Sequence, residues 1–195
     1  MASLAPHRKA IVAALVLIAI ALVVLLAMGR PPICECGTIK VWHGDINSSG
    51  NSQHLSDWYT PSHIIHGMLF YALGWLLFAR FGIGGKSAPK WSYTLAVALE
   101  AAWEVIENTP MVIDRYRSVT VNWGYSGDSV LNSLADLGWM SVGFYLALKL
   151  PVRVTVVLAV FMEILAGWVV RDNLTLNVLM MIWPVDAVAA WQAAG

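Results

Sequence analysis

The sequence has little charge and lacks the familiar short motifs of soluble enzymes. Only 12% of its 195 residues are Asp, Glu, Lys or Arg, about half the share typical of soluble domains, and the formal net charge is zero. A neutral chain gives no reason to expect nucleic acid as a partner. No Walker loop, Rossmann fingerprint, nucleophile elbow or haem-attachment motif occurs. Composition therefore points away from a soluble protein.

Long apolar runs are what the sequence has in abundance, since 58% of its residues are hydrophobic. Six runs are long enough to span or nearly span a bilayer: 10–28, 61–81, 91–107, 130–148, 152–170 and 174–191. Pro184 lies within the last run and is expected to kink the helix rather than end it, because apolar residues continue on both sides. The sequence predicts an all-α polytopic transmembrane helical bundle with about six spans.

The first apolar run resembles a signal peptide in its basic start, at His7, Arg8 and Lys9. It is longer than the roughly 7–15 residues of a usual signal core, so we expect a retained helix. The predicted parts are an N-terminal transmembrane helix (1–29), an extracytoplasmic loop (30–60) and a five-helix membrane domain (61–195). The proposed cytoplasmic loops have more Lys and Arg and no Asp or Glu, which places both termini in the cytoplasm.

The predicted outer loop contains the only two cysteines, Cys34 and Cys36. One residue apart, they are too close for a relaxed disulfide within a strand, although a local one can form. Together with His43 and His54 they could bind zinc or copper. The alternative, which we prefer, is a structural thiol pair in a small hairpin.

Ionisable residues from three predicted helices converge at the outer end of the bundle. Helical spacing puts each group on one face of its helix, and the groups are His63 and His66; Glu100, Glu104 and Glu107; and Asp128, Asn132 and Asp136. Buried charges near a bilayer core usually face the interior of the bundle and need partners. We therefore expect a polar pocket near the outer leaflet.

This pocket suggests a binding or catalytic site for a lipid head group. The candidate acid–base residues are His63, His66, Glu104, Glu107 and Asp128, and the same set without Asp128 could hold a divalent metal. Anion binding is assigned to four residues near the ends of these helices, Arg115, Arg117, Asn108 and Asn132. The expected partners are the bilayer and an anionic lipid or polyprenyl-phosphate head group.

Two other functions remain open. The polar cluster could only lock helices together, in a structural or assembly subunit of a membrane complex. A proton-coupled carrier would use Glu100, Glu163 and Asp186 as a path, but no inverted repeat is evident.

Several motifs resemble a known family. CECG, SQHLSDWYTPSHIIHG, EAAWEVIEN, YSGDSVLNSLADLG and VRDNLTLNVLMMIWP together resemble an uncharacterised family of multi-pass bacterial inner-membrane proteins, mostly alphaproteobacterial. That resemblance implies an inner-membrane location and no particular activity. More remotely, the middle of the chain is similar to the VanZ-like family, which implies a cell-envelope role; the matching residues would be His66, Glu104 or Glu107, Arg115 or Arg117, Asp128, Asn132 and Gly138.

Overall fold

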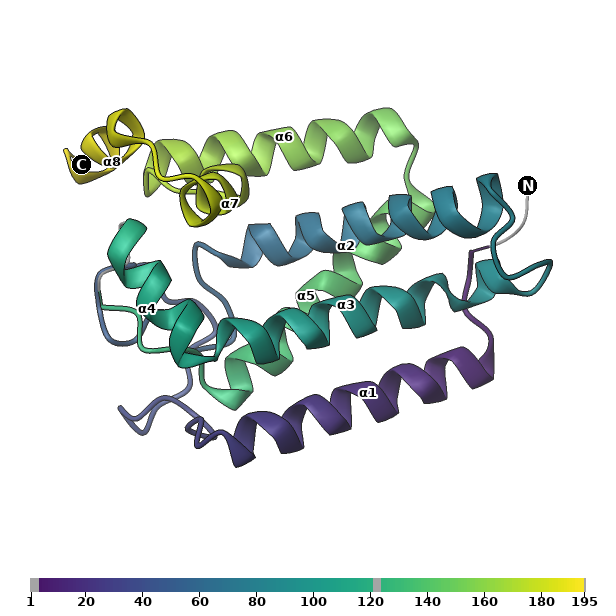
Figure 1. Ribbon diagram of the computed structural model, residues 1–195, viewed down its shortest axis with the longest axis horizontal. Helices are drawn as coiled ribbons and strands as arrows, with labels where there is room; N and C mark the ends of the chain where they lie inside the picture. Colours follow the sequence, from purple (N-terminus) through teal and green to yellow (C-terminus); the bar gives the residue numbers. More distant parts are fainter. Residues whose placement is uncertain (1–3, 121–123, 195) are drawn as a thin grey trace.

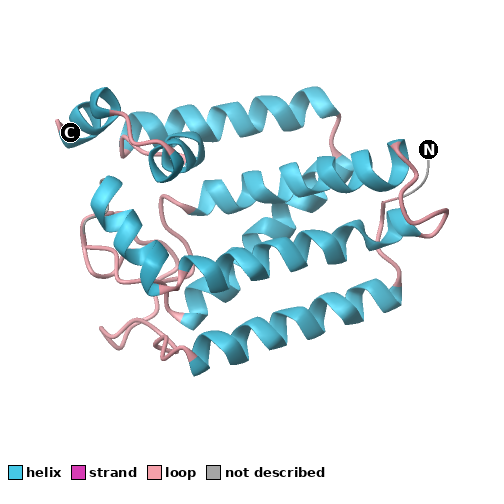
Figure 2. Cartoon of the chain, viewed as in Figure 1, coloured by secondary structure: helices cyan, strands magenta, loops and turns pink. Residues whose placement is uncertain are grey.

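The computed structural model describes residues 4–120 and 124–194, and these residues form helices and loops without a strand (Figure 2). The all-α prediction is confirmed. The helices are α1 (Arg8–Ala27), α2 (Thr60–Gly74), η1 (Trp75–Arg80), η2 (Ala88–Trp91), α3 (Ser92–Glu107), α4 (Pro110–Val119), α5 (Val130–Lys149), α6 (Val152–Val169), α7 (Leu174–Ile182) and α8 (Asp186–Ala193). Helix η1 continues α2 in wider π-helical turns.

Five long helices make up the bundle. In Figure 1, α6, α2, α3 and α1 follow one another across the molecule, and α5 crosses behind α2 and α3. Contacts join α2 to α3, α5 and α6, and join α1 to α3. Helix α2 therefore lies at the centre, in contact with the three helices that carry the other predicted site residues or enclose them.

The sixth predicted run is not one helix. It is divided into α7 and α8, because the residue before Pro184, Trp183, leaves the helical region at φ −140° and ψ 87°. Steric conflict with a following proline disfavours helical backbone at this position. The prediction that Pro184 only kinks the helix is wrong. A nine-residue helix extends about 14 Å, less than half of the roughly 30 Å hydrocarbon core.

This division also changes where the chain ends. After α6 the two short helices stay at the same end of the bundle, and α1 begins at the opposite end from α8 (Figure 1). The expectation that both termini lie in the cytoplasm depended on a sixth span, and it stays a prediction.

Three helical segments among the described residues are long and apolar enough to cross a membrane: Arg8–Ala27, Thr60–Arg80 and Val152–Val169. Their outer faces are apolar and uncovered. Val157 and Ile164 on α6 are each 65% exposed, and Val23 on α1 is 66% exposed. Six spans are not confirmed, and the structure supports three candidates.

Two glycines let α2 and α5 touch backbone to backbone. A Cβ atom on Gly67 would lie 1.9 Å from the carbonyl oxygen of Met140, and one on Gly143 would lie 1.8 Å from that of Ile64. Each glycine shares a helical face with a residue nearer the loop end, His63 four positions before Gly67 and Asp136 seven before Gly143. The close crossing therefore brings His63 and Asp136 together.

The loop between α1 and α2 covers the start of α5. Gln53 donates its side-chain N–H to the Gly127 carbonyl at 2.7 Å, and the amide of Asn132 donates to the His54 carbonyl at 2.8 Å. Cys34 and Cys36 form a disulfide in this loop. Their sulfurs lie within 4.8 Å of a His54 ring nitrogen, but a disulfide does not offer the thiolates that a soft metal needs.

Candidate functional site

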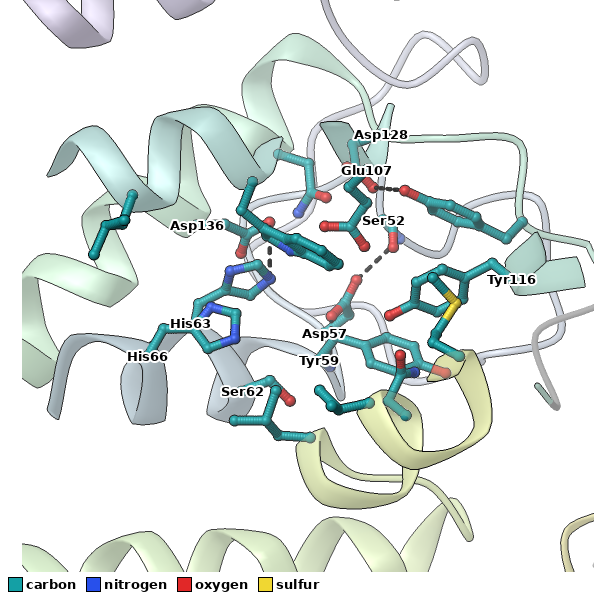
Figure 3. Close-up of a pocket in the computed structure, with 18 of the residues that line it drawn as sticks. Ser52, Asp57, Tyr59, Ser62, His63, His66, Glu107, Tyr116, Asp128 and Asp136 are labelled. Carbon is teal, nitrogen blue, oxygen red and sulfur yellow. Dashed lines mark hydrogen bonds and ion pairs between the residues drawn. The ribbon is translucent and has the colours of Figure 1, made fainter. Parts of the chain in front are cut away.

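A cavity of about 510 Å³ opens between the loop and helices α2, α3, α4, α5 and α7 (Figure 3). One wall is apolar, with side chains from α2, α3 and α7: Phe70, Leu99, Trp103, Leu174, Val178, Met181 and Ile182. The rest of the lining is largely polar and acidic, and includes His63, His66, Glu107, Asp128, Asn132, Asp136, Asp57 and three tyrosines. The cavity suits a ligand that has one polar and one apolar part.

Glu100 holds both histidines of α2 at the base of the cavity. One of its oxygens lies 2.7 Å from Nδ1 of His63, and the other lies 3.0 Å from Nδ1 of His66. Glu100 is fully buried. An ionised carboxylate only accepts hydrogen bonds, so each imidazole places a proton on Nδ1 toward Glu100. This arrangement is common behind histidines that bind metals through the other nitrogen.

Two more carboxylates lie near the ring of His63. Nε2 lies 3.7 Å from Oδ2 of Asp136, an interaction drawn in Figure 3, whereas Oε1 of Glu104 lies 3.6 Å from Nδ1. His63, Glu104 and Asp136 form a group whose ligand atoms all lie within 4.8 Å of one another. Two donors bound to the same ion at about 2.1 Å lie roughly 3.0–4.2 Å apart, depending on their angle at the metal. The pair of His63 and Asp136 fits this range.

Glu104 is the most unusual of these groups. It is fully buried, and neither of its carboxylate oxygens has a hydrogen-bond partner among the described residues. It also belongs to a second group, with Glu107 and Asp128, again within 4.8 Å. Two ionised carboxylates at that distance repel by about 3 kcal/mol at an effective dielectric constant of about 20. Buried acids this close need protons or cations between them.

Asp128 is held rigidly from outside the cavity. Asn108 donates its amide to Oδ2 of Asp128 at 2.7 Å and accepts the Asp128 backbone N–H at 2.7 Å, and the Tyr125 hydroxyl donates to Oδ1 at 3.0 Å. Burial raises the pKa of Asp128 to about 6, although both side-chain hydrogen bonds act against this increase. Asn108 thus positions an acid rather than contacting a ligand.

The predicted anion-binding arginines lie elsewhere. Arg115 donates from Nε and Nη2 to the Met181 carbonyl, at 3.1 and 3.0 Å, so it fastens α4 to α7. Arg117 is exposed. None of the described residues that line the cavity is a lysine or arginine. Arg30, which the sequence analysis did not select, donates to the backbone carbonyl of Asp128 at 2.9 Å.

Of the other residues selected from the sequence, some lie at the cavity and some lie away from it. The structure brings His63, His66, Glu104, Glu107 and Asp128 to one place, and Asn132 lines it as well. Glu163 instead accepts the backbone N–H groups of Leu174 and Thr175 at 3.0 Å each, at the start of α7. Asp186 begins α8 and does not line the cavity.

Some residues at the site were not selected from the sequence. Asp136 was grouped with Asp128 and Asn132 in the predicted pocket but was given no catalytic or metal role, and its distance to His63 is what suggests one. Tyr125 and Arg30 carry no sequence signal, because they reach Asp128 through the folding of loops.

Comparison with known proteins places the chain in a family. Residues 25–194 match the model described as "Protein of unknown function (DUF2585)". The chain belongs to this family. A UPF0314 protein of Novosphingobium aromaticivorans is 56% identical over 173 residues, which cover 89% of this chain and 87% of that protein. One from Sinorhizobium fredii is 57% identical over 183 residues, covering 94% and 90%.

The family extends to less similar chains. A UPF0314 protein of Paracoccus denitrificans is 49% identical over 182 residues, covering 93% of this chain and 91% of that protein. No solved structure matches. The predicted membership of an uncharacterised, largely alphaproteobacterial family is confirmed, and the remoter likeness to the VanZ-like family stays a prediction.

Proposed function

We propose that this protein is a multi-pass protein of the bacterial inner membrane whose cavity binds a divalent cation and, through that cation, the phosphate of an anionic lipid or polyprenyl phosphate. The observation that carries the proposal is that His63, Asp136 and the fully buried Glu104, whose oxygens accept no hydrogen bond among the described residues, have ligand atoms within 4.8 Å of one another. His63 and Asp136 line a cavity that also has apolar side chains in its lining.

The uncovered apolar helices support the membrane location. An aliphatic face such as that of α6, with Val157 and Ile164 each 65% exposed, is costly in water and matches acyl chains. The cavity would lie toward the extracytoplasmic side, because it is at the end of the bundle where the loop before α2 lies, opposite the basic start of α1 (Figure 1).

A cation explains how an acidic cavity could accept an anion. None of the described residues that line the cavity is a lysine or arginine. Six acidic residues line the cavity or lie next to its lining: Asp57, Glu100, Glu104, Glu107, Asp128 and Asp136. A phosphate would be repelled unless a metal ion reversed the local charge. The metal would be held by His63, Glu104 and Asp136 and would clamp a phosphate oxygen.

The apolar wall supports an amphiphile rather than a free phosphate. Leu174, Val178 and Ile182 of α7 line the same cavity as the acidic residues, together with Leu99 and Trp103 of α3. A lipid with its phosphate at the acidic wall would place its first methylene or isoprene units against these side chains.

Metal analysis and lipid binding on the detergent-purified full chain test the proposal. We expect one or more divalent ions per chain, and native mass spectrometry should show phosphatidate or polyprenyl phosphate bound far better than a neutral diacylglycerol, with binding lost in EDTA. Asp136→Asn should lose metal and lipid together, whereas Asp114→Asn, an exposed acid outside the cavity, should lose neither.

Two results would overturn the proposal. One is a wild-type protein that takes up no stoichiometric Mg²⁺, Mn²⁺ or Zn²⁺. The other is lipid binding that persists unchanged in EDTA and in Asp136→Asn. Comparison of the two phosphate lipids at equal concentration would decide which source of the head group is preferred.

A further inference from the structure

We propose that the cavity has a second divalent cation site, formed by Glu104, Glu107 and Asp128, and that the carboxylate of Glu104 bridges the two cations. This inference rests on the proposed metal site of His63, Glu104 and Asp136 and deepens it.

Glu104 is the only residue shared by the two groups of potential ligands, among the residues that the structure describes. One group contains His63 and Asp136, and the other contains Glu107 and Asp128, with ligand atoms within 4.8 Å in each. The carboxylate of Glu104 is fully buried, and both of its oxygens lack a hydrogen-bond partner within the described part of the chain. Because Glu104 belongs to both groups, a cation in each group could take one of its two oxygens, which is the bridging position and satisfies both.

Helical geometry places the second group one turn nearer the loop end of the bundle. Glu107 follows Glu104 by three positions, so its side chain lies on the same face of α3 about one turn further on. Asp128 approaches from the loop before α5. Figure 3 shows Glu107 and Asp128 next to each other, on the side of the cavity away from His66.

The surroundings of Asp128 resemble those of a prepared ligand. Asn108 and Tyr125 donate to its two oxygens at 2.7 and 3.0 Å, which fixes the carboxylate and leaves further lone pairs on each oxygen. Hydrogen bonds of this kind orient carboxylates that bind metals. Glu107 lines the cavity and is only half-buried, so its side chain can turn toward an ion.

The two sites differ in the cation that they favour. The second group offers only carboxylate oxygens, which are the ligands preferred by Mg²⁺ and Mn²⁺. The first group adds the imidazole nitrogen of His63, which also suits Zn²⁺. Two cations joined by one carboxylate would face the cavity together, so that one phosphate group could bridge them. The inferred ligand is therefore a phosphate-bearing amphiphile held by a pair of ions.

Titration of the full detergent-purified chain with Mn²⁺, followed by electron paramagnetic resonance, tests the inference. We expect two Mn²⁺ per wild-type chain and a loss of the six-line signal of isolated ions, because ions that share a carboxylate are magnetically coupled. Glu107→Gln should bind one Mn²⁺ and regain the six-line signal. The control Asp114→Asn, on the exposed face of α4, should behave as wild type.

The outcomes separate this inference from the proposed function. One uncoupled Mn²⁺ per wild-type chain, unchanged in Glu107→Gln, would overturn the second site and leave the first intact. No bound Mn²⁺, Mg²⁺ or Zn²⁺ would overturn both. The wild-type stoichiometry and spectrum decide the question even if Glu107→Gln is poorly folded.

Discussion

The replacement of Gly143 by alanine tests the link between helix packing and the site. The new Cβ atom would lie 1.8 Å from the carbonyl oxygen of Ile64, about 1.6 Å less than the 3.4 Å at which ordinary contact begins. The obstacle is the backbone of α2, which has no rotamer to change. Helices α2 and α5 must therefore move apart by roughly that amount.

The expected cost follows from this displacement. Overpacking of a filled interior costs about 1–3 kcal/mol, and a clash with backbone should lie at the upper end of this range. For a chain of this size, 3 kcal/mol corresponds to a melting temperature about 6–12 °C lower. The distance from His63 Nε2 to Asp136 Oδ2, 3.7 Å in the structure, would grow beyond the roughly 4.2 Å that one ion can bridge. Metal affinity should fall together with stability.

Gly138 provides a matched control on the same helix. Its Cβ position is open, with no atom within 4 Å, and the residue is exposed. Gly138→Ala should leave metal binding unchanged and raise the melting temperature slightly, because alanine is favoured over glycine in a helix by up to about 1 kcal/mol. Melting curves in detergent and metal titrations of both variants check the prediction. Equal behaviour of Gly143→Ala and Gly138→Ala would refute the close crossing of α2 and α5.

Three further predictions concern residues around the site. Burial raises the pKa of Asp172 to about 6, although hydrogen bonds from Asn177, Tyr59 and the Asn173 backbone act against this increase, so the folded state favours the protonated form. This contribution, about 3 kcal/mol, is full below pH 4 and is lost as pH rises through 6. Asp172→Asn should flatten the pH dependence of the melting temperature between pH 4 and 7, and an unchanged slope would contradict the assignment. Arg115→Ala should expose α7 to limited proteolysis because it loses the bonds to Met181, whereas Arg117→Ala should leave both proteolysis and lipid binding unchanged. Asn108→Ala should weaken Mn²⁺ binding about 10–100-fold, because Asp128 loses a hydrogen bond that orients its carboxylate. Circular dichroism should show that the variant keeps its fold. An affinity equal to that of the wild type would show that Asp128 is not a ligand.

Much of the helical framework could be predicted because its signal is local. The apolar runs 10–28, 61–81, 91–107, 130–148 and 152–170 correspond to α1, α2 with η1, α3, α5 and α6 to within two residues. The sixth run failed because hydropathy does not register the backbone restriction that Pro184 places on Trp183. The contact of Gly67 and Gly143 lies between helices distant in sequence, so no motif within one helix could reveal it.

The acidic and histidine side chains that gather at the candidate site could be predicted from the sequence, whereas the arginines predicted for it lie elsewhere. Helical periodicity groups Glu104 with Glu107 and places them near His63, since each group lies on one face of a helix. The arginines of α4 were assigned to the same cavity from proximity in sequence. The direction of a short helix between two loops is set by tertiary contacts, and Arg115 is turned toward α7 by the carbonyl of Met181.

The acidic cluster has a cost that protons or cations must offset. Glu104 accepts no hydrogen bond among the described residues and lies 3.6 Å from Nδ1 of His63, and each ionised carboxylate within 4.8 Å would add about 3 kcal/mol of repulsion. A fold of ordinary stability, about 5–15 kcal/mol, cannot retain several such repulsions and gain nothing. A ligand that binds only the folded state stabilises it by about 2.7 kcal/mol at 100 times its dissociation constant. If the proposed cation site is occupied, the close crossing at Gly67 and Gly143 holds its ligands together and the bound ion stabilises the fold.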